Sequence, residues 1–235
     1  MATDQGVIST ETVIVAAGVW SRRLLKPLGE NLPMQWIRAT VAETAPVPGF
    51  DEIPAVWDAK VAFRKTEAGG LIFAASGRTD VDLTFSSLNN LKLFAPTLLK
   101  NLKSFHVHVG KPLWRDAAGR LTNADARPNR KTVRRSFADL KAMFPVLKDA
   151  TIARSWAAYI DGTPDNLPVL SRVPSVDGLV VGAGFSGHGF GLAPASGSIL
   201  ADLATAGHCD DYDITPFRYS RFAEPGYRFE LSMGR

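Results

Sequence analysis

A glycine-rich segment near the end of the sequence, residues 178–197, limits the possible folds more than any other part of the chain. It opens with a short apolar run, residues 179–181, whose β-branched side chains between glycines predict a buried strand. The glycines that follow, up to Gly191, let the backbone turn sharply and approach another group closely. A helical pattern then begins, and its apolar positions share one broad face: Leu192, Ile199, Leu200 and Leu203.

This succession of strand, turn and helix suits the binding of an electron-rich ligand. The first N–H groups of a helix have no acceptor within the helix, and the helix dipole adds partial positive charge at the same end. Glycines in such a position also occur in plain tight turns, which is the alternative interpretation.

The order of residue types in the turn is more specific than its glycine content. The run Gly184-Phe-Ser-Gly-His-Gly-Phe190, followed by Leu192-Ala-Pro194, resembles the C-terminal flavin-binding signature of the FAD-dependent amino-acid and amine oxidoreductases, the D-amino acid oxidase superfamily. In that family the turn faces the pyrimidine end of the isoalloxazine ring. The resemblance therefore implies FAD as cofactor, bound by Gly184, Phe185, Ser186, Gly187, His188, Gly189 and Phe190. His188 could instead serve only as a hydrogen-bonding partner of the backbone.

A second signature lies at the start of the chain. Residues 12–21, Thr-Val-Ile-Val-Ala-Ala-Gly-Val-Trp-Ser, predict a buried strand, a glycine-containing turn and a helix over residues 21–28. In α/β folds a ligand lies beyond the carboxyl end of such a strand. The segment resembles the second FAD-domain signature of the same family, which implies that Ala17, Gly18 and Trp20 line the middle of the FAD.

In a complete family member, a βαβ unit carrying Gly-x-Gly-x-x-Gly comes before that second signature. No Gly-x-Gly-x-x-Gly unit precedes Thr12. Residues 182–187 match the Gly-x-Gly-x-x-Gly pattern, but the acidic residue that should end a following parallel strand is missing. The nearest candidate, Asp202, lies within the predicted helix. The resemblance thus covers nearly the whole chain but only the latter half of the family fold. We expect a truncated reading frame, an excised piece, or one subunit whose partner chain supplies the N-terminal FAD-binding half.

The predicted fold class is α+β or α/β. Residues 1–31 and 156–235 are expected to form a partial, Rossmann-like FAD-binding domain. Residues 32–155 are expected to form a substrate domain, built on an antiparallel sheet with flanking helices. The sheet is read from strands over residues 32–44 and 56–65, a turn at 67–70 and a return strand over 71–75.

Three further segments carry predictions about local structure. Residues 88–105 are read as a leucine-rich helix restarted by Pro96, with a core position favoured over an exposed patch. The basic run 127–135 is read as a solvated loop. Residues 136–147 are read as a helix with Ser136 as its N-cap, followed by a strand over residues 151–159.

Composition limits the setting and excludes several function classes. With a single cysteine, Cys209, the chain has no internal disulfide, which fits a reducing compartment. A metal site is not expected at Cys209 and His208, nor at His106 and His108, because no second group of ligands accompanies either pair. No apolar run reaches the roughly 18 residues of a membrane span, no leader precedes the first strand, and no basic patch with aromatic residues suggests nucleic acid. We expect a cytoplasmic protein, with a peripheral position at the inner membrane face as the alternative.

The resemblance also implies a reaction. The leucine-rich helix and the ending Thr215-Pro-Phe with Arg221-Phe222 resemble the bacterial membrane-associated L-amino acid deaminases, with sarcosine- and dimethylglycine-type enzymes as close competitors. The implied reaction oxidises the C–N bond of an amino acid or secondary amine by hydride transfer to the flavin. Two residues are candidates for catalysis: Arg78, as the cation that binds the substrate carboxylate, and Tyr159, at the end of the strand that follows Trp156. The alternative is a non-catalytic subunit or vestigial fragment that cannot bind FAD alone, and we expect the isolated chain to be colourless.

Overall fold

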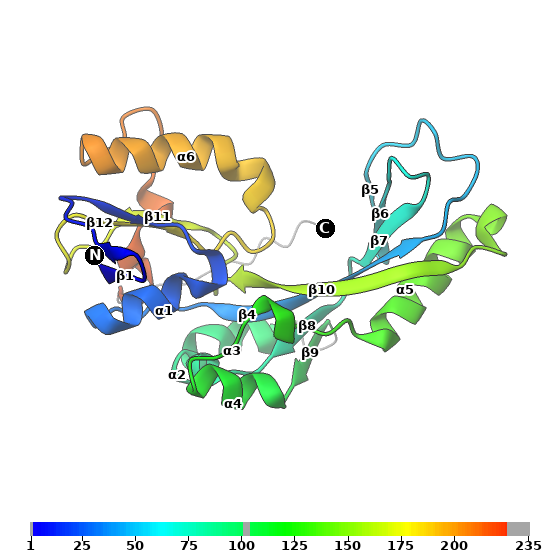
Figure 1. Ribbon diagram of the computed structural model, residues 1–235, viewed down its shortest axis with the longest axis horizontal. Helices are drawn as coiled ribbons and strands as arrows, with labels where there is room; N and C mark the ends of the chain where they lie inside the picture. Colours follow the sequence, from blue (N-terminus) through cyan, green and yellow to red (C-terminus); the bar gives the residue numbers. More distant parts are fainter. Residues whose placement is uncertain (1, 101–103, 225–235) are drawn as a thin grey trace. The chain divides into compact units, whose positions relative to one another are not determined.

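The computed structural model describes residues 2–100 and 104–224 of the 235-residue chain (Figure 1). The chain forms two compact units. Unit 1 comprises residues 1–36, 86–97 and 160–235, and unit 2 comprises residues 37–85 and 98–159. Both units mix helices with sheets, which confirms the predicted fold class.

Unit 1 is built on a three-stranded sheet in the order β11–β12–β3. Strand β12 (Leu179–Ala183) is antiparallel to β11 (Val169–Arg172) and parallel to β3 (Val13–Val15), with Val181 opposite Val15. All five residues of β12 are buried, which confirms the strand predicted there. Side chains alternate between the two faces of the sheet, as strand geometry requires.

Helices cover both faces of that sheet (Figure 1). Helix α6 (Gly189–Thr205) packs Ile199 and Leu203 against Leu170 and Val180 on one face. On the other face, helix α1 (Ser21–Leu25) contributes Leu25 to a cluster whose sheet residues include Val15, Val169 and Val181. The remaining elements of unit 1 are short: β1 (Ala2–Thr3), β2 (Gly6–Val7) and the 3-10 turns η1 (Gly18–Trp20), η2 (Lys26–Leu28), η5 (Thr215–Phe217) and η6 (Tyr219–Ala223).

Unit 2 is built on a larger, mostly antiparallel sheet in the order β5–β6–β7–β4–β8–β9, and β10 also pairs with β4. Its strands are β4 (Gln35–Thr44), β5 (Val56–Trp57), β6 (Val61–Lys65), β7 (Leu71–Ala75), β8 (Thr79–Asp82), β9 (Phe105–His108) and β10 (Ile152–Gly162). The first two residues of β4 and the last three of β10 belong to unit 1. Helix α5 (Arg130–Met143) covers it, with Phe137 stacked on Phe73 at 5.5 Å between ring centroids. The predicted hairpin with its turn at residues 67–70 is confirmed by the pairing of β6 with β7. Helix α4 (Lys111–Ala117) and the 3-10 turns η3 (Asn123–Asp125) and η4 (Pro145–Leu147) complete the unit.

The prediction of one strand over residues 56–65 is wrong. The chain reverses at Asp58, and β5 pairs antiparallel with β6 so that Val56 lies opposite Phe63. The Asp58 carboxylate accepts the N–H of Lys60 at 3.3 Å, and the Asp58 N–H donates to the Val61 carbonyl at 3.2 Å. Aspartate stabilises turns through this kind of local hydrogen bond, which outweighs the strand propensity on either side.

The start of α5 also differs from the prediction. The helix begins at Arg130, and its N-cap is Asn129, whose side chain accepts the N–H groups of Lys131 and Thr132. Ser136 is buried in the second turn, and its hydroxyl donates to the Thr132 carbonyl at 2.8 Å. Residues 130–135 of the basic run therefore form the first turns of a helix rather than a solvated loop, and only residues 127–129 precede it.

The leucine-rich segment is divided into two helices, α2 (Phe85–Asn89) and α3 (Leu91–Lys100), and Pro96 lies inside α3 instead of restarting it. Phe94 is buried, but Leu88, Leu91 and Leu99 are 43%, 49% and 68% exposed. The favoured core position is thus wrong for these three leucines. Within the part of the chain that is described, no helix has both the length and the apolar character needed to cross a bilayer.

Candidate active site

Parallel pairing brings the two predicted flavin signatures to one edge of the unit 1 sheet. Strands β3 and β12 run in the same direction, with Val15 opposite Val181. Their carboxyl ends therefore meet at the same edge, where Ala17 and Gly18 follow β3 and the segment from Gly184 follows β12. Two motifs from opposite ends of the sequence thus become neighbours, as a shared ligand requires.

The glycine-rich turn, which we define as residues 184–187, adopts a backbone that few sequences tolerate. Gly184, Ser186 and Gly187 have φ angles of +78°, +53° and +91°. A Cβ atom at Gly184 would lie 2.3 Å from the Thr163 Cγ2 atom, which excludes any larger residue without a shift of the neighbouring chain. Gly184 is therefore required by both its backbone angle and its close packing.

The end of β10 supports the glycine-rich turn from inside the unit. The Gly184 N–H donates to Asp161 Oδ2 at 2.7 Å, and the Ser186 N–H donates to the Asp161 carbonyl oxygen at 3.0 Å. The Thr163 N–H donates to Ser186 Oγ at 3.2 Å. Burial raises the pKa of the Asp161 carboxyl above its ordinary value of 3.8, while backbone N–H groups, including those of Gly184 and Phe185, oppose that rise.

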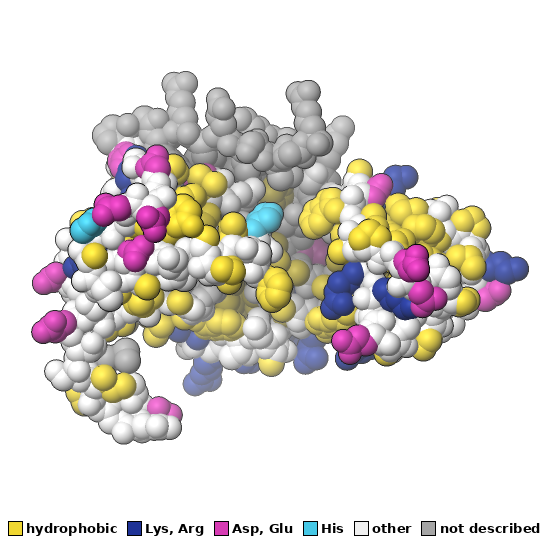
Figure 2. Space-filling view, turned by 90° about the horizontal axis from the view of Figure 1, so that it is seen from above, with side chains coloured by type: hydrophobic (Ala, Val, Ile, Leu, Met, Phe, Trp, Pro, Cys, Tyr) yellow, Lys and Arg dark blue, Asp and Glu magenta, His cyan; other side chains and the backbone are white. Residues whose placement is uncertain are grey.

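The other side of the turn is open. Gly187 and His188 are exposed, and the Phe190 side chain is 99% exposed. Seen from above, this face of unit 1 shows hydrophobic side chains together with much white surface from backbone and small residues (Figure 2). A Cβ atom at Gly191 would meet nothing within 4 Å. The turn is therefore not closed off by its own protein.

Helix α6 begins at Gly189, earlier than predicted, and this places more N–H groups beside the turn. The N–H groups of Gly189, Phe190 and Gly191 have no acceptor among the described residues, because the first backbone bond at this end runs from Leu192 to the His188 carbonyl at 3.2 Å. Leu192 is 41% exposed, so its predicted place on the buried face is wrong. Open space, exposed N–H donors and a helix dipole together fit the electron-rich end of a flavin.

The residues after β3 form a second tight bend. Gly18 has a φ of +53°, and the Ala17 N–H donates to Ser21 Oγ at 3.1 Å. Trp20 packs edge to face against Trp36, with 5.9 Å between the ring centroids. Ala17, Gly18 and Trp20 are all partly exposed at this edge of the sheet.

The two residues predicted to act in catalysis belong to unit 2. Arg78 is half-buried between β7 and β8, and its guanidinium makes no hydrogen bond or ion pair with another described residue. Tyr159 is buried, and its hydroxyl donates to Asp82 Oδ2 at 2.8 Å. Arg38 Nη2 lies 3.2 Å from Asp82 Oδ1 in the same group. Burial, and then the neighbouring Asp82 carboxylate, raise the pKa of the Tyr159 phenol well above its ordinary range.

The histidine and cysteine residues that were considered as metal ligands have other surroundings. His108 Nε2 lies 2.6 Å from Asp80 Oδ1, and Asp80 also accepts hydrogen bonds from the Asn129 side chain. Cys209 packs at the edge of the apolar cluster that contains Ile199 and Leu203. No group of three or more potential ligands that could hold a metal occurs among the described residues.

Sequence reasoning missed the two aspartates that organise this region. Asp161 supports the glycine-rich turn, and Asp165 forms a buried ion pair with Arg221, in which Nε and Oδ2 are 2.8 Å apart. Arg221-Phe222 was recognisable as part of a motif, but the sequence does not show its partner. Strand β10 ends at Gly162, and the chain turns at residues 163–166, where the Asn166 N–H donates to the Thr163 carbonyl at 3.4 Å.

Comparison with known proteins supports the interpretation of both signatures. The family model described as "FAD dependent oxidoreductase" matches residues 2–203. Peroxisomal sarcosine oxidase from Homo sapiens is 30% identical over 217 residues, covering 92% of this chain and 49% of the relative. Glycine oxidase from Pseudomonas aeruginosa is 29% identical over 205 residues, covering 86% of this chain and 44% of the relative.

Solved structures show the same architecture. L-amino acid deaminase from Proteus vulgaris superposes with a TM-score of 0.81 at 23% identity, covering 94% of this chain and 54% of the other. L-amino acid deaminase from Proteus myxofaciens, in complex with anthranilate, superposes with a TM-score of 0.82 at 24% identity, covering 95% and 52%. The chain thus spans about half the length of the proteins that it matches.

Proposed function

The chain belongs to the FAD dependent oxidoreductase family, and from that premise we propose that it forms half of an enzyme that oxidises the C–N bond of an amino acid or secondary amine. In this proposal unit 1 corresponds to the FAD-binding domain and unit 2 to the substrate domain. The observation that carries the proposal is the convergence of the two signatures at one sheet edge, through the parallel pairing of β3 with β12. Bound FAD supplies the chemistry, by accepting the hydride that leaves the carbon of the C–N bond.

The residues that would hold the cofactor are those already predicted from the sequence. Ala17, Gly18 and Trp20 would lie along its middle. The electron-rich ring would rest on the turn and the start of α6, at Gly184, Phe185, Ser186, Gly187, His188, Gly189 and Phe190. The exposed N–H groups of the first turn of α6 support this assignment, because they stabilise negative charge nearby.

We further propose that Arg78 binds the substrate carboxylate. Its guanidinium is half-exposed and has no partner among the described residues, so both of its donor edges are available. Tyr159 contributes through its packing. Because its hydroxyl donates to Asp82, it also holds the Asp82–Arg38 ion pair in place.

The proposal includes a partner chain or a further segment that completes the FAD-binding domain. Strand β3 ends the unit 1 sheet, and its outer edge pairs with no described strand. Such an edge can accept a further strand. The alternative function, a non-catalytic subunit or vestigial fragment, predicts a chain that never carries a reducible flavin.

One experiment separates these two functions. The chain is purified alone and after coexpression with the product of the neighbouring reading frame, and flavin absorbance is recorded before and after anaerobic addition of L-amino acids, glycine or sarcosine. We expect a colourless chain alone, and in the complex a flavin that is bleached by one of these substrates. A bound flavin that none of the substrates reduces would support the alternative.

The role of Arg78 is tested in the same complex. Arg78→Ala should raise KM for the amino acid roughly ten- to a hundredfold, the range expected for losing a hydrogen bond to a charged group. The matched amine without a carboxylate should show no change. Arg64→Ala, which removes an exposed arginine of β6 in the same unit, is the control. An equal effect on both substrates would contradict a carboxylate-binding role.

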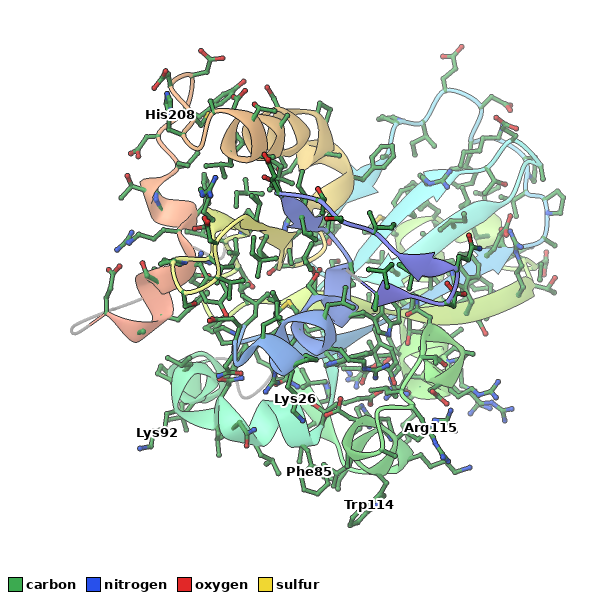
Figure 3. The ribbon with its side chains drawn as sticks, turned by 60° about the vertical axis from the view of Figure 1, so that its left-hand side comes forward. Lys26, Phe85, Lys92, Trp114, Arg115 and His208 are labelled. Carbon is green, nitrogen blue, oxygen red and sulfur yellow. The ribbon has the colours of Figure 1, made fainter. Side chains whose placement is uncertain are left out.

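We also propose a cytoplasmic protein that associates peripherally with a membrane through unit 2. Phe85 and Trp114 pack edge to face with 5.9 Å between ring centroids, yet remain 42% and 68% exposed. Both side chains project outward from the ribbon in Figure 3. Val109, 72% exposed, and the exposed Lys111 adjoin Trp114 in sequence. Aromatic rings beside basic residues suit the interface between lipid and water.

Cosedimentation with vesicles of anionic phospholipid tests the membrane proposal. Trp114→Ala should lower the bound fraction several-fold. Trp57→Ala, which removes a tryptophan that is 78% exposed elsewhere in unit 2, should leave it unchanged. Equal binding by both variants would contradict the proposal.

A further inference from the structure

The glycine-rich turn does not hold its own conformation. Three of its four residues have positive φ angles, and one of them is Ser186, which has no glycine-like freedom at +53°. Such angles persist only where surrounding contacts determine them. The only backbone hydrogen bond from the turn to the start of α6, among those described, is the His188 N–H to the Phe185 carbonyl at 2.9 Å. Inside the turn, the Ser186 hydroxyl donates to the Gly184 carbonyl at 3.3 Å, and the remaining contacts that fix the backbone come from outside the turn.

We propose that Asp161 is a positioning residue, which fixes the glycine-rich turn by accepting the N–H groups at its entrance. Its Oδ2 atom accepts the Gly184 N–H at 2.7 Å, and its carbonyl oxygen accepts the Ser186 N–H at 3.0 Å. Asp161 thereby holds the backbone N–H groups of the residues before and after Phe185. The importance of this role for catalysis rests on the proposed function, whereas the role in fixing the turn does not.

These contacts divide the N–H groups of the region into two sets. Those at the entrance, on Gly184 and Ser186, point inward to Asp161. Those at the exit, on Gly189, Phe190 and Gly191, keep no acceptor among the described residues and remain available to a ligand. Since Asp161 fixes the first set, it determines the direction in which the second set points.

The chemistry of residue 161 supports positioning rather than simple stabilisation. Asp161 is 8% exposed, and the groups acting on its carboxylate are backbone N–H donors rather than a cation. A buried carboxylate without a cation is costly in free energy. Asparagine would avoid that cost but offers one acceptor oxygen in place of two. The carboxylate is explained by the three backbone N–H groups that act on it, those of Gly184, Asp161 itself and Phe185, because two oxygens offer more acceptor positions than a single amide oxygen.

Hydrogen exchange of backbone amides tests the inference on the full chain without any flavin. Asp161→Ala should accelerate exchange at Gly184, Phe185 and Ser186 by about tenfold or more, since hydrogen bonds to charged groups are among the stronger ones. Exchange in β12 and in the buried part of α6 should change much less. Asp161→Asn should fall between wild type and Asp161→Ala, because one acceptor oxygen remains.

Val180→Ala is the matched control, because Val180 is fully buried in the same sheet and makes no contact with Asp161 that the hydrogen bonds record. It should accelerate exchange throughout unit 1. If Asp161→Ala gives wild-type exchange at the turn, or the same uniform pattern as Val180→Ala, the inference is overturned.

A second measurement separates this inference from the proposed function. In the flavin-loaded complex, a displaced turn should make the flavin reduction potential more negative in Asp161→Ala, with partial recovery in Asp161→Asn, because the N–H donors no longer face the charge that reduction adds. An unchanged potential would overturn the positioning role toward the flavin. If no variant and no wild-type complex binds flavin, the proposed function fails, and the exchange result alone decides the role of Asp161.

Discussion

Arg221 and Asp165 form a two-point ion pair in the interior of unit 1. Arg221 Nε lies 2.8 Å from Asp165 Oδ2, and Nη2 lies 3.1 Å from Oδ1. The guanidinium also donates to the Leu167 carbonyl at 2.8 Å and the Arg218 carbonyl at 3.1 Å. Arg221 is 2% exposed and Asp165 is 9% exposed, so both side chains are buried and their charges neutralise each other. The pair joins η6 to the Thr163-Pro-Asp165 segment.

Removing one member of this pair should be strongly destabilising. Arg221→Ala leaves the Asp165 carboxylate buried without its cation, and we expect a loss of about 3–5 kcal/mol in the free energy of unfolding. Arg218→Ala removes a pair with Glu224 in which both side chains are 38% exposed, and should destabilise the chain far less, because water and salt screen an exposed pair. Urea denaturation measures both, and equal losses would show that burial does not govern the Arg221 pair.

An added methyl group should destabilise the chain at Gly184, in the glycine-rich turn, but have little effect at Gly191, in the first turn of α6. Gly184→Ala combines a positive φ with a Cβ atom 2.3 Å from Thr163 Cγ2, and should cost about 2–4 kcal/mol. Thr163→Ser removes that Cγ2 atom and should recover part of the loss in the double variant. Gly191→Ala, where the added atom meets open space, should stay within about 1 kcal/mol of wild type. Thermal unfolding of the four variants tests this, and a double variant no more stable than Gly184→Ala would exclude the proposed clash.

The N-cap of α5 gives a test that distinguishes the structure from the sequence prediction. Asn129→Ala removes the acceptor for Lys131 and Thr132 and should cost about 1–2 kcal/mol. Ser136→Ala should change the free energy of unfolding by less than about 1 kcal/mol, because Ser136 lies inside the helix, where alanine is favourable. The reverse order in chemical denaturation would restore Ser136 as the N-cap.

Tyr159 should make unfolding depend on pH in the alkaline range. Its pKa is raised above the ordinary value of 10.0 by burial and by Asp82, so the folded state holds the phenolic proton more tightly than the unfolded state. The stability that this contributes is fully present below about pH 10 and is lost as the pH rises above it. Tyr159→Phe has no such proton, so the stability difference between the two proteins should shift in favour of the variant above pH 10. Guanidinium denaturation at pH 8 and at higher pH measures it, and a constant difference would count against a raised pKa.

The elements that the sequence predicted well are those whose pattern is local. Strand β12 and the hairpin at residues 67–70 were readable because apolar runs and glycines mark them directly. The flavin signatures were readable as motifs, but the parallel pairing that joins their strands came only from the structure. Their predicted contact with a cofactor stays a prediction.

Apart from the local turn at Asp58, these misses occur where a tertiary contact decided between local alternatives. Asn129 became the N-cap of α5 because its side-chain amide also donates to Asp80, a buried residue of a distant strand. No local pattern distinguishes it from Ser136, which is an equally good capping residue. Asp161 was unrecognised for the same reason, since its partner Gly184 lies on another strand end and shows no side chain that could reveal the pairing.

The segment from Asp161 to Asp165 has a consequence for the carboxyl-terminal part of the chain. Alternate side chains on it serve two ends of the unit: Asp161 and Thr163 contact the bend before α6, while Asp165 binds Arg221. Proteolytic loss of everything after Ile214 would therefore remove Arg221 and leave the Asp165 carboxylate without its cation, on the same short segment that holds the bend. The carboxyl-terminal segment thus supports the bend indirectly, and we expect a nick there to disturb the conformation of the glycine-rich turn even though residues 184–187 are all present.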